Sequence, residues 1–61
     1  MPLNARQIDG VKSLLRRAAE LVEDALNVAD AASDRSMVIR LNSLRRTMLD
    51  EIADLDRAAR E

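Results

Sequence analysis

The stretch SDRSMVIRLNSLRRTMLDEIADLDRAA, residues 33–59, decides the fold of this chain. Its apolar positions recur at alternating steps of three and four, which is the heptad pattern of a helix that packs along one seam against other helices. These positions are Val38, Leu41, Met48, Ile52, Leu55 and Ala59. Arg45 falls on the same seam, where an aliphatic residue would be expected. The stretch therefore predicts a long amphipathic helix with one basic residue on its packing face.

A second amphipathic helix precedes this one. Asn4 is a favourable N-cap and Gln7, three residues later, completes a capping box, so we expect the helix to start at Ala5. Its seam runs through Ile8, Val11, Leu15, Ala18, Val22, Ala25 and Ala29. A further row, at seven-residue spacing beside this seam, consists of Leu14, Leu21 and Val28. The combined stripe is wider than a two-stranded coiled coil needs and suits a helix with more than one neighbour.

A short break separates the two helices. Residues 30–34 contain no Gly or Pro, but Ser33 as N-cap with Asp34 at the first helical position suits a new helix start. The alternative is one unbroken helix of roughly 80 Å. With the break, we expect a single domain with a helix over about residues 5–29, a turn over 30–33 and a helix over about 34–59.

The charge pattern favours the hairpin. Net charge is +3 over residues 1–17, −5 over 18–34, +4 over 35–46 and −3 over 47–61. An antiparallel hairpin lays the first block on the fourth and the second on the third, so opposite signs face each other. Because an exposed ion pair contributes only about 0–1 kcal/mol, these charges choose the orientation more than they add stability.

The length of the chain predicts self-association. A core within 61 residues rarely supplies more than about 3–5 kcal/mol, and such chains usually need disulfides, a metal or partner chains. The sequence has no Cys and no His, so oligomerisation is the remaining route. We expect an all-α antiparallel hairpin that forms a bundle, most simply a dimer of four helices. The expected oligomer interface consists of Ile8, Val11, Leu15, Val22, Val38, Leu41, Met48, Ile52 and Leu55.

Composition argues against most other functional classes. Without Cys or His, no Ser-His-Asp or Cys-His constellation is possible, so we predict no enzyme, no cofactor and no metal site. The absence of aromatic residues removes stacking platforms for single-stranded nucleic acid, and the acidic blocks would repel a phosphate backbone. No apolar run is long enough for a membrane span, and no secretory signal is visible. The expected location is the cytoplasm, which is the host cytoplasm if a phage encodes the chain.

A cluster of arginines on the second helix is the candidate ligand site. Arginine offers a planar fork of donors for phosphate or carboxylate groups. The candidate ligand-binding residues are Arg35, Arg40, Arg45, Arg46, Asn42 and Thr47. The alternative is that these arginines pair with Glu20, Glu23 and Asp24 on the neighbouring helix, and that Arg45 only fixes the register.

Two resemblances bear on architecture and function. Leu26-Asn27 and Asp30-Ala31 before the turn, followed by the seam from Val38 to Leu55, resemble the Rop family of small RNA-binding proteins. This resemblance implies an antiparallel four-helix dimer and RNA binding, although Arg45 replaces a small seam residue of that family. Asp34-Arg35, Ile39, Leu44 and Met48-Leu49 are similar to the helical sponges by which phages sequester cyclic-nucleotide signals. That similarity implies sequestration of a nucleotide.

From these observations we expect a non-enzymatic, oligomeric helical binding module, a regulator or phage-type inhibitor that engages a protein partner. The alternative is a sponge that sequesters a small anionic nucleotide ligand through the arginine cluster. Rop-like RNA binding is the third possibility.

Overall fold

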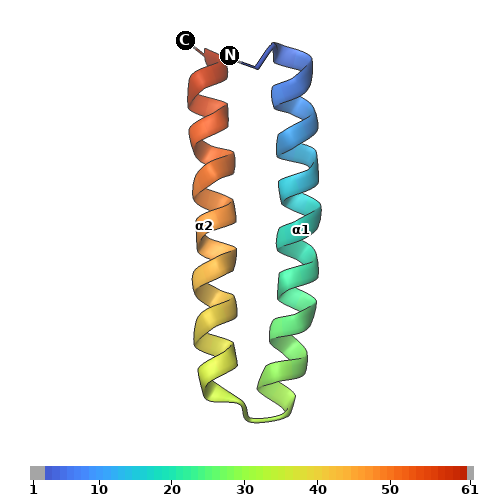
Figure 1. The fold of residues 1–61 in the computed structure, drawn as a ribbon, viewed down its shortest axis with the longest axis vertical. Coiled ribbons are helices and arrows are strands. Elements are labelled where there is room, and N and C mark those ends of the chain that lie inside the picture. The colour runs from blue at the N-terminus through green and yellow to red at the C-terminus, as the bar shows by residue number, and fades with distance from the viewer. Residues whose placement is uncertain (1–2, 61) are drawn as a thin grey trace.

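The chain folds into an antiparallel helical hairpin. In the computed structural model, which describes residues 3–60, helix α1 spans Ala5–Ala31 and helix α2 spans Arg35–Arg60. The two helices lie side by side along their whole length, with the turn at one end and both chain ends at the other (Figure 1). The molecule measures 43 × 17 × 14 Å. The all-α hairpin predicted from the heptad and charge patterns is therefore present.

The start of α1 follows from its local sequence. The Asn4 side chain accepts a hydrogen bond from the Gln7 backbone N–H at 2.8 Å, and the Gln7 side chain accepts one from the Asn4 N–H at 3.0 Å. This reciprocal capping box satisfies two backbone donors that have no partner within the helix. The helix starts at Ala5, as the sequence predicts.

The turn is built differently from the prediction, because α1 extends to Ala31 and Asp34, not Ser33, caps α2. The Asp34 carboxylate accepts a hydrogen bond from the Met37 backbone N–H at 3.1 Å. Ser33 adopts a left-handed conformation with φ of 59°. Its N–H donates to the Asp30 carbonyl, and the Asp34 N–H donates to the Ala29 carbonyl. This pair of bonds is a Schellman motif, so Ser33 occupies the position that usually takes glycine.

The packing between α1 and α2 forms a thin core. Among the side chains that the structure describes, only Ala19, Ala29 and Ile52 are buried, and Ile52 retains 8% of its exposure. The nine residues predicted for an oligomer interface all lie on the face where the helices of one chain meet, half-buried or, for Ile52, buried. The seam position predicted at Ala59 lies in α2, but its side chain is outside the described part of the structure. Within one chain, the helices thus shield their shared seam only in part.

Neither helix has the length of apolar sequence that crossing a membrane requires, over the residues that the structure describes.

Candidate functional site

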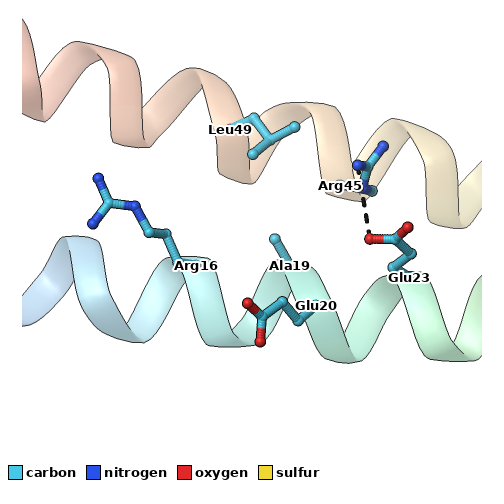
Figure 2. Close-up of a pocket in the computed structure, with 6 residues that line it drawn as sticks. All are labelled: Arg16, Ala19, Glu20, Glu23, Arg45 and Leu49. Carbon is cyan, nitrogen blue, oxygen red and sulfur yellow. Dashed lines mark ion pairs between the residues drawn. The ribbon is translucent and has the colours of Figure 1, made fainter.

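One side of the hairpin carries the charged contacts between the helices, and we call it the ion-paired flank. It consists of Lys12, Arg16, Ala19 and Glu23 on α1 with Arg45, Leu49 and Asp56 on α2. The Lys12 ammonium pairs with the Asp56 carboxylate, and the Arg45 guanidinium lies 3.8 Å from the Glu23 carboxylate. Figure 2 shows Arg45 and Glu23 reaching toward each other across the gap, with Leu49 above Ala19. These contacts link the two helices at two levels.

The two ion pairs differ in their surroundings. The Lys12 side chain is only 15% exposed, and its hydrogen bond to Asp56 lowers the pKa of that carboxyl below its ordinary value. Partial desolvation opposes this shift, whereas the charges of Lys12, Arg16 and Arg60 reinforce it. The Arg45 side chain is 40% exposed, although it stands on the seam. It reaches the edge of the helix pair and keeps its charge partly in water.

Among the three acids predicted as partners for the arginines, the structure selects one for Arg45. Glu23 pairs with Arg45, while Glu20 lines the same shallow depression without a charged partner of its own in residues 3–60. Asp24 is exposed elsewhere on α1. The partner of Arg45 thus depends on the register of the two helices and not only on the net negative charge of residues 18–34.

The predicted ligand-binding residues are divided among separate places on α2. Arg45 and Arg46 line one open depression with Asn42 and Ser43. The Thr47 hydroxyl donates to the Ser43 carbonyl at 3.1 Å, as side chains of this type often do within a helix.

The other two arginines lie apart from this depression. Arg35 lines a different hollow near the turn with Asp30, Ser33 and Val38. Arg40 is exposed on α2. The fold therefore brings together Asn42, Arg45 and Arg46 of the predicted set, and it leaves Arg35 and Arg40 outside that group.

The opposite side of the hairpin is apolar. Leu14, Leu21 and Val28 on α1 are 66%, 62% and 71% exposed, and Met37 and Leu44 on α2 are also exposed. With Ile8 and Val38 assigned to heptad position a, each of these five residues comes directly before a seam residue and therefore occupies position g. Lys12 and Asp56 are e positions. Since e residues face each other on one side of an antiparallel pair and g residues on the other, we call these five residues the apolar flank.

No group of three or more acidic side chains that could hold a metal ion occurs within residues 3–60. The two flanks therefore differ chemically: the ion-paired flank offers cationic and carboxylate groups beside the exposed Leu49, and the apolar flank offers aliphatic side chains.

Comparisons with protein-family models, with curated proteins and with solved structures find no match to this chain. The resemblance in layout to Rop-type hairpins thus extends to the architecture of two antiparallel helices, and no family is identified.

Proposed function

We propose that the chain is a non-enzymatic helical module that self-associates and whose assembled surface binds a protein partner. The apolar flank carries this proposal. Leu14, Leu21 and Val28 form a row of aliphatic side chains at seven-residue spacing, and the hairpin itself leaves each of them more than half exposed. A contiguous exposed apolar surface on a small protein usually marks an interaction site.

The thin core points in the same direction. The described side chains include three buried ones, two of them alanines, which is a small core for a chain of this length. Fully burying a Leu or Val side chain contributes about 1.5–3 kcal/mol. Three such side chains from each of two copies would contribute on the order of 10 kcal/mol, which is comparable with the cost of association. Self-association would therefore shield apolar side chains that the isolated hairpin leaves in water, with a gain that offsets the cost of bringing two copies together.

The composition of the sequence supports a binding role over a catalytic one. The chain has no Cys or His and no aromatic residue, so nucleophiles activated by imidazole, thiolate chemistry and base-stacking surfaces are all absent from its sequence. An assembled bundle would still present the charged side chains of the ion-paired flank outward.

We further propose that the module acts in the cytoplasm, in a host cell if a phage encodes it, because a chain without Cys has no need of an oxidising compartment.

A second candidate is the sequestration of a small anion such as a nucleotide. The depression lined by Asn42, Ser43, Arg45 and Arg46 favours it, since two arginines and two neutral polar residues line the same place. The carboxylate of Glu23, 3.8 Å from the Arg45 guanidinium, would compete with such a ligand. For this reason we rank anion binding below protein binding.

Native mass spectrometry of protein purified gently from its own host tests these candidates together. The proposed function predicts species at integer multiples of 6.8 kDa, some of them carrying an additional polypeptide. Oligomers that carry a small-molecule mass would favour anion sequestration, and oligomers that carry RNA would favour Rop-like binding. A monomer alone at all concentrations would overturn the proposal of self-association.

The anion candidate has its own direct test. Titration with a cyclic dinucleotide, followed by calorimetry, should give heat with the wild type and none with Arg46→Ala if the depression is a ligand site. Arg35→Ala is the matched control, because Arg35 lines a different hollow. Absence of heat with the wild type would remove cyclic dinucleotides as ligands.

A further inference from the structure

The ion pairs show the register between α1 and α2. The residue numbers of Lys12 and Asp56 total 68, and so do those of Glu23 and Arg45. A residue on α1 therefore lies level with the α2 residue for which the two residue numbers also total 68. Leu21 is accordingly level with Thr47, near the middle of the hairpin.

The exposed apolar row on α1 is symmetric about the same level. Leu14 and Val28 each lie seven residues from Leu21. A two-fold axis perpendicular to α1 at Leu21 would set Leu21 against Leu21 of a second copy, and Leu14 against Val28 of that copy. An interface of this kind is self-complementary, as a two-fold dimer requires.

Charged residues beside the row are arranged about the same axis. Arg17 and Asp24, both exposed on the outer edge of the row, have their midpoint half a residue from Leu21. On α2, Arg40 and Asp54 occupy the equivalent heptad positions, both exposed, and their midpoint is Thr47. One axis therefore brings Arg17 to within one residue of the level of Asp24 of the second copy, and Arg40 level with Asp54 of the second copy.

From this coincidence we infer that the apolar flank is covered by a second copy of this chain in one defined orientation, with the two turns at opposite ends of a four-helix bundle. The inference rests on the self-association proposed above and adds its geometry. In this arrangement α1 packs against α1 of the second copy, and α2 against α2. The contact between the α1 helices is the more apolar of the two, since Glu51 and Ala58 continue the row that Met37 and Leu44 begin on α2.

Other orientations fit these residues less well. Parallel α1 helices would place Arg17 beside Arg17 and Asp24 beside Asp24 of the second copy, so that like charges meet. In another alternative, the two turns lie at the same end and α1 lies beside α2 of the second copy. The oppositely charged residues of the two copies would then be offset by three to four residues, or about 5–6 Å along the helix.

The inferred arrangement, with the turns at opposite ends, reduces this offset to about one residue or less.

Single-cysteine variants test the orientation cleanly, because the chain contains no natural Cys. With a short bis-maleimide, Leu21→Cys should link to itself and give a covalent dimer. Leu14→Cys should not, since two Leu14 positions in this arrangement lie about 21 Å apart along the helix. A mixture of Leu14→Cys with Val28→Cys should link. Each variant is first shown to sediment as the wild type does.

Charge reversal provides a second measurement. Arg17→Asp alone and Asp24→Arg alone should each weaken dimerisation by about tenfold, because each places like charges together twice in the dimer. The double variant Arg17→Asp/Asp24→Arg should recover the wild-type Kd. Recovery is specific to the opposed contact between α1 helices.

The possible outcomes separate the inference from the proposed function. A dimer in which Leu14→Cys links to itself, or in which Leu21→Cys does not, would overturn the orientation and leave self-association standing. If the double variant Arg17→Asp/Asp24→Arg dimerises as weakly as the two single variants, the orientation is likewise overturned and self-association still stands. A chain that remains monomeric at every concentration would overturn both.

Discussion

The two flanks of the hairpin use opposite means to hold neighbouring helices. On the ion-paired flank, Lys12 and Glu23 reach Asp56 and Arg45 within the same chain, and both contacts correspond to the same register. On the apolar flank, Leu14, Leu21 and Val28 stay more than half exposed among residues 3–60, the part that the structure describes. The difference shows that two helices can make polar contacts along one flank while a row of aliphatic side chains on the other flank stays exposed.

The largest effect is expected from Leu21→Glu on the apolar flank. This substitution removes two aliphatic side chains from the proposed dimer interface and sets two like charges together at its centre. We expect Kd for dimerisation to rise by at least 100-fold, about 3 kcal/mol, measured by sedimentation over a range of protein concentrations. Asn27→Glu, an exposed position on the far side of α1, is the matched control and should leave Kd nearly unchanged. Equal behaviour of the two variants would show that the apolar flank is not an interface.

On the ion-paired flank, Arg45→Leu is expected to stabilise the protein. Arg45 stands on the seam, and its pair with Glu23 is largely exposed, so the lost attraction is small and the gained apolar burial outweighs it. We expect the free energy of unfolding to rise by about 1 kcal/mol, measured by urea titration monitored by circular dichroism. Arg46→Leu, on an exposed position next to it, should bring no such gain. Destabilisation by Arg45→Leu would mean that the ion pair contributes more than seam packing.

The turn belongs to neither flank, and Ser33→Gly should act independently of both. Ser33 has φ of 59°, a conformation that glycine adopts without the steric cost of a Cβ. We expect a gain of about 0.5–1 kcal/mol in the free energy of unfolding, with no change in Kd for dimerisation. Asp34→Gly should instead destabilise, since the Asp34 carboxylate caps α2. A loss of stability in Ser33→Gly would contradict the left-handed assignment.

The smallest effect is expected from Asp56→Asn, and it should depend on pH. Lys12 lowers the pKa of Asp56 in the folded state below its unfolded value. The stabilisation is therefore present above the unfolded pKa, near 4, and is lost as the pH falls through the lowered folded value. At pH 7 the melting temperature of Asp56→Asn should lie slightly below that of the wild type, and the two should converge as the pH falls through the lowered pKa of Asp56. A difference that does not shrink as the pH falls below the unfolded pKa would assign it to packing and not to the charge of Asp56.

The sequence predicted the features that depend on local patterns. Asn4 with Gln7 specified the start of α1, because both halves of a capping box lie within four residues. The exposed row of Leu14, Leu21 and Val28 was visible from its spacing. The arrangement of the turn was predicted wrongly, because Ser33 and Asp34 are adjacent residues that both favour N-caps. The hydrogen bond from the Met37 N–H to the Asp34 carboxylate shows that Asp34 caps α2, and the bonds that close the end of α1 place Ser33 in the turn.

The candidate site was harder to predict than the fold. Glu20, Glu23 and Asp24 lie within about one helical turn, so charge alone could not choose the partner of Arg45. That choice depends on the register between the helices, which is a property of the whole hairpin. The same holds for the predicted arginine cluster, because Arg35 and Arg45 are separated by almost three turns of helix, about 15 Å.

The environment of Lys12 has a consequence for chemical labelling. Lys12 is the one lysine in the sequence, and its amine is both shielded and paired with Asp56. An amine-reactive reagent should therefore modify it mainly while the ends of α1 and α2 are apart, as in hydrogen exchange through local opening. The rate of modification at Lys12, located by peptide mapping, would report how often this end of the hairpin opens. The protein thus contains its own probe of fraying.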